Sequence, residues 1–449
     1  MTYDSAIAKL FELGHELSRI PSHKFELVHM RVLLEALGNP QTTFKSVLIA
    51  GTNGKGSTAA TLASILSAAG HQTGLYTSPH LIRINERIRM NGQGISNEDF
   101  SRTYEAVEPV ASLLVIQGKL PWHPSFFEML TAMAFCHFKE AGVEIAVLEV
   151  GMGGRLDATN VVDPLVAVIT DISLDHQRFL GNTIAEIATE KAGIIHPGGL
   201  LVTLPQHPAA NDVIGKAVLE RGARAVSAVQ FVPPVSPGVK GTAWDRSGTG
   251  GYPLTVMGEE ITVKSPLSGR HQLRNTALAI AAAEQLNSLG INVTARDIES
   301  GIRKTRWPGR FQVLAQTQAR PEIVLDVAHN PAGAWALRSA LSERYEDRRI
   351  TLLFAVLRDK AVGEIAEILF PIADQVVVTA VDNPRGAAPE EVAAATRSSL
   401  NAILDPDLGD ALDRAIGLTS NQGILVITGS IYLVGAALSR LESASESDR

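Results

Sequence analysis

The sequence contains the stretch Gly51-Thr52-Asn53-Gly54-Lys55-Gly56-Ser57-Thr58 between an apolar run at residues 47–50 and a helix-like run at residues 59–66. A glycine-rich segment between a strand and a helix is typical of a loop that binds phosphate. Its backbone amides and the helix N-terminus face the negative charge, and Lys55 can neutralise part of that charge. We therefore expect these residues to bind a nucleotide, with Ser57 or Thr58 within reach of Mg²⁺.

One residue departs from the common form of this loop. In that form Ser or Thr follows Gly-Lys directly, whereas here Gly56 separates Lys55 from Ser57. The alternative interpretation is a glycine-rich turn from a strand into a helix that binds no ligand.

Apolar runs that resemble strands recur along the chain, and helix-like segments separate most of them. They lie at residues 47–50, 145–150, 165–170, 199–203, 323–327, 350–355, 375–380 and 424–428. Continuous apolar strands that alternate with amphipathic helices are typical of parallel sheets covered on both faces, so the predicted fold class is α/β. Ligands of such sheets bind beyond the carboxyl ends of the strands. Polar clusters follow four strands, at residues 51–58, 151–160, 171–176 and 326–330.

The composition indicates an ordinary globular protein with two or three domains. Of the 449 residues, 45% are hydrophobic and 19% are charged, and the formal net charge is -7. This acidic balance argues against broad binding of nucleic acid or of anionic membranes. Cys136 is the only cysteine, which excludes an intramolecular disulfide and suits a reducing cytoplasm. We expect Cys136 to pack in the core.

Several segments bear on export and on domain boundaries. Residues 1–20 predict an amphipathic helix with no export signal, and the interrupted apolar stretch 424–438 predicts a strand, a turn and a helix instead of a membrane span. The Pro-, Gly- and Ser-rich stretch 232–253 predicts a surface excursion. A second break near residues 305–310 predicts a domain boundary there, with domains at 1–309 and 310–449.

Three ionisable residues have both a chemical and a structural interpretation. Glu149 lies near the end of an apolar strand, where a carboxylate is costly unless a metal ion, Arg155 or another base pairs with it. His176 follows the next strand, but a lone histidine is more often structural. Lys191 would by itself be a solvated lysine on a helix. The residues alone leave these alternatives open.

Seven motifs occur in register along nearly the whole chain, among them Thr77-Ser78-Pro79-His80-Leu81 and Asp326-Val327-Ala328-His329-Asn330-Pro331. The other five lie at residues 51–57, 149–160, 174–176, 190–194 and 428–430. Together they resemble the folylpolyglutamate synthase and dihydrofolate synthase family, within the Mur ligase superfamily, of which the inserted Gly56 is characteristic. The resemblance implies a P-loop-containing Mur-ligase-like central domain with a parallel-rich sheet, followed by a smaller Rossmann-like C-terminal α/β domain that ligates glutamate.

The resemblance also implies an activity. It is the ATP-dependent formation of an amide between a pteroyl carboxylate and the amino group of L-glutamate, with ADP and phosphate as products. Transfer of the γ-phosphoryl group would make an acyl phosphate that the neutral amine attacks. The substrates would be dihydropteroate or reduced folates, and no residue decides between one activity and both. A monomer in the cytoplasm is expected.

By matching position, the resemblance assigns ligands to two Mg²⁺ ions. Ser57, itself a candidate Mg²⁺ ligand, and the loop backbone would hold the triphosphate, while Ser78 and Glu149 would bind one ion. The second ion would be shared by Glu149, His176 and a carbamate that CO₂ forms on Lys191. A carbamate requires a neutral Lys191, which desolvation or nearby positive charge favours. The residues implied in catalysis are Lys55, His176 and Lys191.

The resemblance places further residues near the nucleotide or the substrates. Contacts with ATP are implied for Asn275, Arg310 and Asp326. Nucleotide or incoming glutamate would meet His329 and Ser430, and the folate-side loop would include Arg83 and Arg87. The structural alternatives are that Asp326 accepts backbone amides, that Asn330 starts a helix, and that both arginines are plain surface charges.

Ligands drawn from both domains imply that the cleft closes during catalysis, with a hinge near Pro308. Two other functions compete with the folate ligase. A Mur-type peptide ligase would use the same chemistry, but a phosphate loop that begins at Gly51 leaves too little chain for the usual N-terminal substrate domain. In a non-catalytic nucleotide-binding scaffold, Lys55 would bind phosphate while Glu149, His176 and Lys191 only stabilise the fold.

Overall fold

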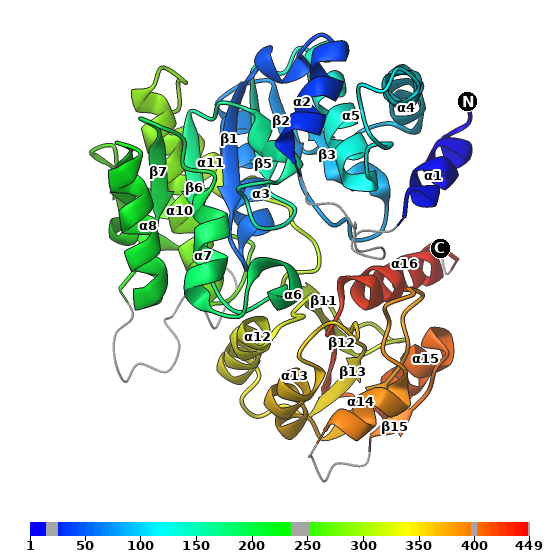
Figure 1. The fold of residues 1–449 in the computed structure, drawn as a ribbon. Helices are drawn as coiled ribbons and strands as arrows, with labels where there is room; N and C mark the ends of the chain where they lie inside the picture. Colours follow the sequence, from blue (N-terminus) through cyan, green and yellow to red (C-terminus); the bar gives the residue numbers. More distant parts are fainter. Residues whose placement is uncertain (15–25, 235–250, 397–401, 448–449) are drawn as a thin grey trace.

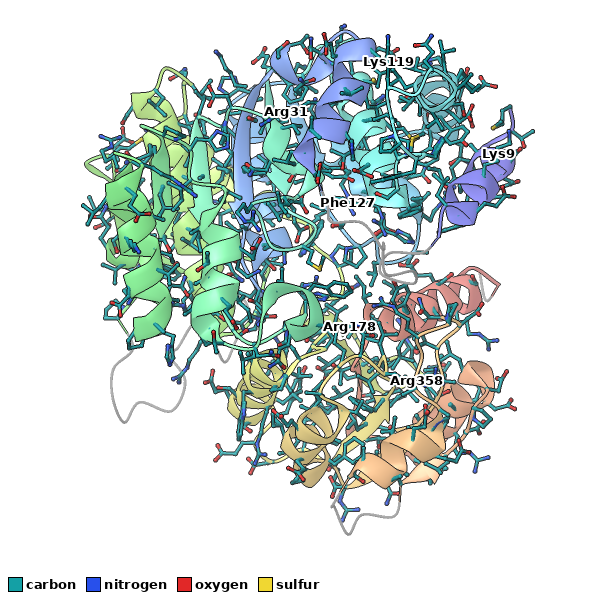
Figure 2. All side chains as sticks on the ribbon, in the orientation of Figure 1. Lys9, Arg31, Lys119, Phe127, Arg178 and Arg358 are labelled. Carbon is teal, nitrogen blue, oxygen red and sulfur yellow. The ribbon has the colours of Figure 1, made fainter. Side chains whose placement is uncertain are left out.

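The structure is a computed structural model that describes residues 1–14, 26–234, 251–396 and 402–447. In these residues the strands form sheets of eight, two and six members. Figure 1 shows the two larger sheets in separate α/β units, one above the other. We call the part through residue 304 the first unit and the part from residue 312 the second unit. Side chains from both units fill the space between the two ribbons (Figure 2).

The first sheet has the strand order β4-β3-β2-β5-β1-β6-β7-β8. Neighbours from β2 to β8 are parallel, whereas β3 and β4 add antiparallel pairs at one edge. The strands are β1 Lys45–Ala50, β2 Thr73–Tyr76, β3 Ile88–Met90, β4 Gln93–Gly94, β5 Ile145–Glu149, β6 Val166–Ile169, β7 Leu200–Thr203 and β8 Arg224–Ser227. The hairpin strands are β9 Tyr252–Val256 and β10 Glu259–Val263.

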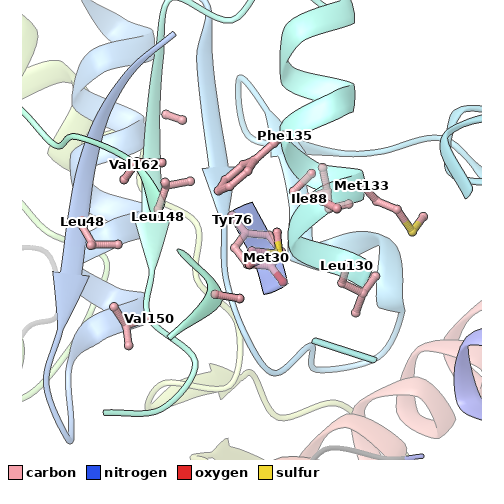
Figure 3. Packing of buried hydrophobic residues seen from close by; sticks show 14 of the residues in the cluster. Met30, Leu48, Tyr76, Ile88, Leu130, Met133, Phe135, Leu148, Val150 and Val162 are labelled. Atoms are coloured by element: carbon pink, nitrogen blue, oxygen red, sulfur yellow. The ribbon is translucent and has the colours of Figure 1, made fainter. Parts of the chain in front are cut away.

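Helices cover both faces of this sheet. The helices are α1 Tyr3–Glu12, α2 Leu27–Ala36, α3 Lys55–Ala68, α4 Asn97–Ile116, α5 Phe126–Glu140, α6 Gln177–Leu180, α7 Ile184–Ala192, α8 Pro208–Glu220, α10 Arg270–Ser288 and α11 Ala295–Lys304. Because side chains alternate along a strand, Val47 and Ile49 pack with α3, α10 and α11, while Leu48 and Ala50 pack with α2, α5 and α7. Figure 3 shows Leu48 and Leu148 on adjacent strands of the second face.

The second unit repeats this plan with the strand order β11-β12-β16-β13-β14-β15, in which only the β11 pair is antiparallel. The strands are β11 Gln312–Leu314, β12 Glu322–Leu325, β13 Ile350–Phe354, β14 Gln375–Val378, β15 Ile403–Leu404 and β16 Ile424–Thr428. One face packs on α12 Pro331–Arg344, α13 Val362–Leu369 and α14 Pro389–Ala395, and the other on α15 Leu408–Leu418 and α16 Ile431–Ser447.

All eight predicted strands are present, within two residues of the expected ends, and the α/β class is confirmed. The stretch 424–438 forms β16, a turn and the start of α16, as predicted. Cys136 packs half-buried against the first core. Of the predicted N-terminal helix, α1 is described and residues 15–20 lie outside the described residues, as do residues 235–250 of the predicted surface excursion. The boundary at 309/310 falls between α11 and β11 and stays a prediction. Within the described ranges, no helix has the length and apolar character needed to cross a membrane.

Candidate active site

The glycine-rich loop joins β1 to α3, as predicted, and presses against its neighbours. Gly54 caps α3 with φ of +87°, a conformation that favours glycine. A Cβ atom at Gly54 would overlap the side-chain amide of Asn275, and one at Gly51 would overlap the Thr170 hydroxyl. The loop backbone is therefore held between α10 and the end of β6, in a fixed shape.

The inserted glycine has a structural reason. A Cβ atom at Gly56 would lie 2.8 Å from the indole ring of Trp307, which belongs to the linker between the two units. The Arg89 guanidinium lies over the same ring, 5.2 Å from its centroid. Trp307 thus contacts the phosphate loop, and a side chain at position 56 would displace it.

Two lysines converge on one carbonyl of the loop. Lys191 Nζ donates to Gly51 O at 2.7 Å, and Lys55 Nζ donates to the same oxygen at 3.1 Å and to Thr52 O at 3.3 Å. Lys191 is 3% exposed, so its interpretation as a solvated helix lysine is wrong. Burial, together with the charge of Lys55, lowers the pKa of Lys191 to about 7. A neutral amine therefore becomes accessible near physiological pH.

Glu149 lies buried at the end of β5, next to the motif that carries Ser78. Its Oε2 accepts the Ser78 amide at 3.2 Å. Arg155 does not pair with Glu149, because it bonds Glu190 at 2.8 Å. Arg310 is one base whose charge acts with that of Glu149. Burial lowers the pKa of Arg310, and the charges of Asp326 and Glu149 raise it.

Asp326 follows β12 and is satisfied within its own unit. Its two oxygens accept the amides of Phe311 at 2.8 Å and Ala328 at 2.9 Å, and Asn330 caps α12 through a bond from the Gly333 amide at 2.8 Å. Both structural alternatives considered for this motif are thus confirmed. Burial raises the pKa of Asp326, against the charges of His271 and Arg310. A contact between Asp326 and ATP stays a prediction.

Asp175 collects partners from both units. Lys360 Nζ lies 2.7 Å from Asp175 Oδ1, and Asn330 Nδ2 donates to Oδ2 at 3.2 Å. His329 Nε2 lies 3.6 Å and His176 Nε2 4.0 Å from the same oxygen. Although burial disfavours its charge, the nearby rings of His329 and His176 and the Lys360 cation hold the pKa of Asp175 well below its usual range. Burial, and then Lys360, lower the pKa of His176 to about 3, so its imidazole is neutral.

Other nucleotide candidates surround the loop. Asn53 and Asn330 exchange a hydrogen bond across the units, with Asn330 Nδ2 2.9 Å from Asn53 Oδ1. Thr52 Oγ1 donates to Ser173 O at 3.0 Å. In the first turns of α3, Ser57 and Thr58 are buried, and Asn275 is buried beside them on α10.

The substrate-side candidates separate into two groups. Arg87 is buried, with its Nε 2.9 Å from His80 Nδ1 and its guanidinium over Phe126, so its interpretation as a surface charge is wrong. Arg83 lies at the surface, over the ring of Tyr3 and bonded to Asn97. Ser430 is buried and caps the start of α16 by accepting the Tyr432 amide at 3.2 Å, which is a structural role of the kind expected for this loop.

A pocket of about 300 Å³, partly open to solvent, lies where the 77–89 segment, the linker and α16 meet. Its lining combines two cations, Arg89 and Arg310, with Trp307, His80 and Ile431. The pocket therefore lies beside Ser78 and Ser430, which the sequence had placed on different domains.

The donor set fits Mg²⁺ held jointly by protein and phosphate. The described part of the chain contains no group of three or more His, Cys, Asp or Glu side chains arranged to hold a metal. Mg²⁺ is usually bound through one or two carboxylates plus substrate phosphates and water, and does not need an all-protein cage. The hydroxyls of Ser57 and Ser78 with the Glu149 carboxylate suit that mode.

Two residues at the site were missed by sequence reasoning. Lys360 follows β13 in Arg358-Asp359-Lys360, and the rule that ligands gather beyond strand ends would have found it. Trp307 was treated only as part of a boundary, and a single sequence carries no signal for its contact with Gly56.

Comparison with known proteins agrees with this architecture. Residues 123–283 match the Mur ligase middle domain, and residues 309–431 match the Mur ligase glutamate ligase domain. The chain is 35% identical over 421 residues to a dihydrofolate synthase/folylpolyglutamate synthase of Bacillus subtilis, covering 93% of this chain and 95% of that protein.

Solved structures give the same result. The folylpolyglutamate synthase of Mycobacterium tuberculosis complexed with ADP and AMPPCP aligns with a TM-score of 0.84 at 35% identity, over 97% of this chain and 98% of that one. FolC of Escherichia coli in complex with DHPP and ADP aligns with a TM-score of 0.82 at 28% identity, over 99% of both chains. The chain therefore belongs to the dihydrofolate synthase/folylpolyglutamate synthase family of Mur ligases, which are ATP-dependent ligases.

Proposed function

We propose that this protein joins L-glutamate to folates, and also to dihydropteroate, at the expense of ATP. The observation that carries the proposal is the convergence of Lys55 and Lys191 on the carbonyl of Gly51. The chain also matches 95% of the length of a dihydrofolate synthase/folylpolyglutamate synthase. A buried phosphate loop with two lysines suits phosphoryl transfer, because that reaction depends on positioning and on charge neutralisation.

The first unit would hold ATP. The amides of residues 52–58 and Lys55 would bind the triphosphate, with Asn275, Arg310 and Asp326 around the nucleotide. Mg²⁺, when bound, neutralises phosphate charge and orients the phosphoryl group for in-line transfer. Its ligands would be Ser57, Ser78 and Glu149 at one ion, and Glu149, His176 and modified Lys191 at a second.

The modification would be a carbamate on Lys191. The neutral amine attacks the carbon of CO₂, an N–C bond forms, and the proton lost from nitrogen passes to water. Two features support it: the bond of Lys191 is to the Gly51 carbonyl and, among the residues that the structure describes, to no carboxylate, and the pKa of Lys191 is lowered to about 7. The product replaces a cation with an anionic oxygen donor, which is the kind of ligand Mg²⁺ prefers.

The pteroyl substrate would lie along the 77–89 segment, where Arg87 and Arg83 can meet its carboxylates, and the incoming glutamate would lie near His329 and Ser430. The buried position of Arg87 supports a role in orientation, while Arg83 is free to adjust at the surface. The monomeric state and the cytoplasmic location stay predictions from the sequence.

The test is phosphate release with Mg-ATP and L-glutamate, with dihydropteroate in one reaction and tetrahydrofolate in another, and with products identified by mass spectrometry. Glutamate-dependent turnover with both acceptors is expected. Turnover with one acceptor restricts the enzyme to that activity, and turnover with neither overturns the proposal in favour of a nucleotide-binding scaffold.

A further inference from the structure

The two units are joined by a buried ion pair far from the linker in sequence. Asp175 follows β6 in the first unit, and Lys360 follows β13 in the second, 185 positions later. Their side chains are 8% and 7% exposed, and the Lys360 nitrogen lies 2.7 Å from Asp175 Oδ1. An ion pair this well covered exists only while the two units are docked.

A second pair of contacts supports the same junction. Asn330 Nδ2 lies 2.9 Å from Asn53 Oδ1 and 3.2 Å from Asp175 Oδ2, and the neighbouring His329 ring lies 3.6 Å from Oδ2. Asn330 is itself fixed, because its Oδ1 accepts the Gly333 amide as the cap of α12. A rigid helix start in the second unit thus reaches two loops of the first.

The first-unit partners adjoin residues with proposed chemical roles. Asp175 Oδ1 also accepts the backbone amide of His176 at 2.8 Å, and His176 has a φ of +50°, which is uncommon for a residue with a side chain. Asn53 belongs to the phosphate loop. Asp175 Oδ1, which accepts from Lys360, therefore also holds the backbone amide of His176, while Asn53 Oδ1, which accepts from Asn330, belongs to the phosphate loop.

The cost of burying charge favours two states of the junction, fully docked and fully separated. Removing two charges from water costs several kcal/mol per ion, which only good geometry and further hydrogen bonds can offset. Asp175 has both when Lys360, Asn330 and His329 are in place. When the units separate, Asp175 and Lys360 regain water instead, so intermediate positions that bury one charge without the other are disfavoured.

We propose that Asp175 is a clasp between the units, and that Lys360 and Asn330 are positioning residues that set the His176 backbone and Asn53 when the second unit docks. The effect on turnover rests on the proposed function. The clasp itself does not, because it can be measured in the unliganded protein and with ADP.

The test compares Lys360→Met with Arg358→Met in the full chain. Arg358, labelled in Figure 2, lies two residues away and pairs at 2.9 Å with Glu391 of its own unit, both about half exposed, so its loss removes the same charge without touching the junction. Small-angle scattering measures the distance between units, and amide hydrogen exchange measures the segment 171–180.

Lys360→Met is expected to increase the radius of gyration and to speed exchange in the 171–180 segment by at least about tenfold, because Asp175 loses its buried partner. Arg358→Met is expected to match the wild type within about twofold, as exposed pairs contribute little. Lys360→Arg, which keeps a donor cation, should recover part of the effect.

Two outcomes overturn the clasp. One is scattering and exchange for Lys360→Met that match Arg358→Met. The other is faster exchange spread over all core strands, which signals general destabilisation without a local role for the pair. If Lys360→Met does not fold, Asp175→Asn keeps the shape of the side chain but removes its charge and replaces one acceptor oxygen with a donor NH₂, and the same two measurements decide. Neither depends on which acceptor the enzyme uses.

Discussion

Lys191 and Lys360 both have buried side chains whose charges act with that of Asp175, and their surroundings are opposite. Lys360 has a carboxylate at 2.7 Å, with further polar partners around that carboxylate. Lys191 has a backbone carbonyl at 2.7 Å and a second lysine that shares it. The surroundings of Gly51 therefore disfavour a charged Lys191, whereas Asp175 supplies a negative partner for Lys360.

The difference suggests two roles: Lys191 takes part in the reaction, and Lys360 holds the two units together. A lysine that pairs with a carboxylate joins parts of the molecule, and a buried lysine whose pKa falls to about 7 can act as a nucleophile near neutral pH. The two regions are linked, because Asp175 borders His176, whose imidazole shares the proposed metal site with Lys191.

The largest expected effect tests whether Lys191 takes part in the reaction. Lys191→Arg keeps a cation near Gly51 but cannot form a carbamate, so kcat should fall on the order of 10³-fold, about 4 kcal/mol of transition-state stabilisation. Phosphate release at saturating substrates measures it. The control is Lys216→Arg, whose lysine is exposed on α8 and pairs with Glu220. Full activity in Lys191→Arg would remove the carbamate from the mechanism.

The next effect tests whether Lys360 stabilises the fold by pairing with Asp175. Asp175→Asn leaves Lys360 buried without a carboxylate, which should lower the free energy of unfolding by about 3 kcal/mol. Urea unfolding followed by circular dichroism measures it. Glu391→Gln removes the charged partner of the half-exposed Arg358 and should lower the free energy of unfolding far less. Equal losses of unfolding free energy in the two variants would mean that the buried Asp175–Lys360 pair stabilises the protein no more than the exposed pair does.

The third effect is the pH dependence that an unpaired lysine must produce. The pKa of Lys191 falls from 10.5 to about 7, so between these values the unfolded chain binds one more proton than the folded chain. Stability then rises with pH across this window by up to about 1.4 kcal/mol per pH unit from Lys191 alone. Below pH 7 both states are protonated and this contribution is flat.

Lys191→Met should lose this rise, and the measurement is urea unfolding of both proteins from pH 7 to 10 in buffer freed of CO₂. Parallel curves for the wild type and Lys191→Met would show that the lysine keeps an ordinary pKa.

The smallest effect isolates the second lysine. Lys55→Met removes the cation that shares Gly51 O, so the pKa of Lys191 should rise by about half a unit, or about 0.7 kcal/mol, with burial still holding it low. Competitive acetylation of Lys191 against pH, read by mass spectrometry, gives this pKa. A return to the ordinary lysine value would assign the whole shift to Lys55 and none to burial.

Much of the fold was predictable because the central strands are continuous apolar runs. The missed strands carry weaker signals: β2 is Thr-Gly-Leu-Tyr, while β4 and β15 have two residues each. The β9–β10 hairpin alternates around Met257-Gly258, but it borders the Pro- and Gly-rich stretch that predicted a loop.

The sequence predicted which strand ends carry residues of the site, but not which side chains pair with one another. Sequence position indicated Glu149, His176 and Asp326, yet it left the partner of Glu149 open between a metal ion, Arg155 and another base. In the structure Arg155 bonds Glu190. The burial of Lys191 depends on how α7 packs on the sheet, and its contact with Gly51 joins residues 140 positions apart. Only tertiary structure fixes such distances.

The contact between Gly56 and Trp307 limits how this sequence can evolve. Because the indole occupies the space that a side chain at position 56 would need, the loop cannot acquire the common arrangement, with Ser or Thr directly after the lysine, while the linker keeps its tryptophan. A smaller residue at 307 would have to be accepted first, and that step would release Arg89 from its ring. The order in which positions 56 and 307 can change in this chain is thereby constrained.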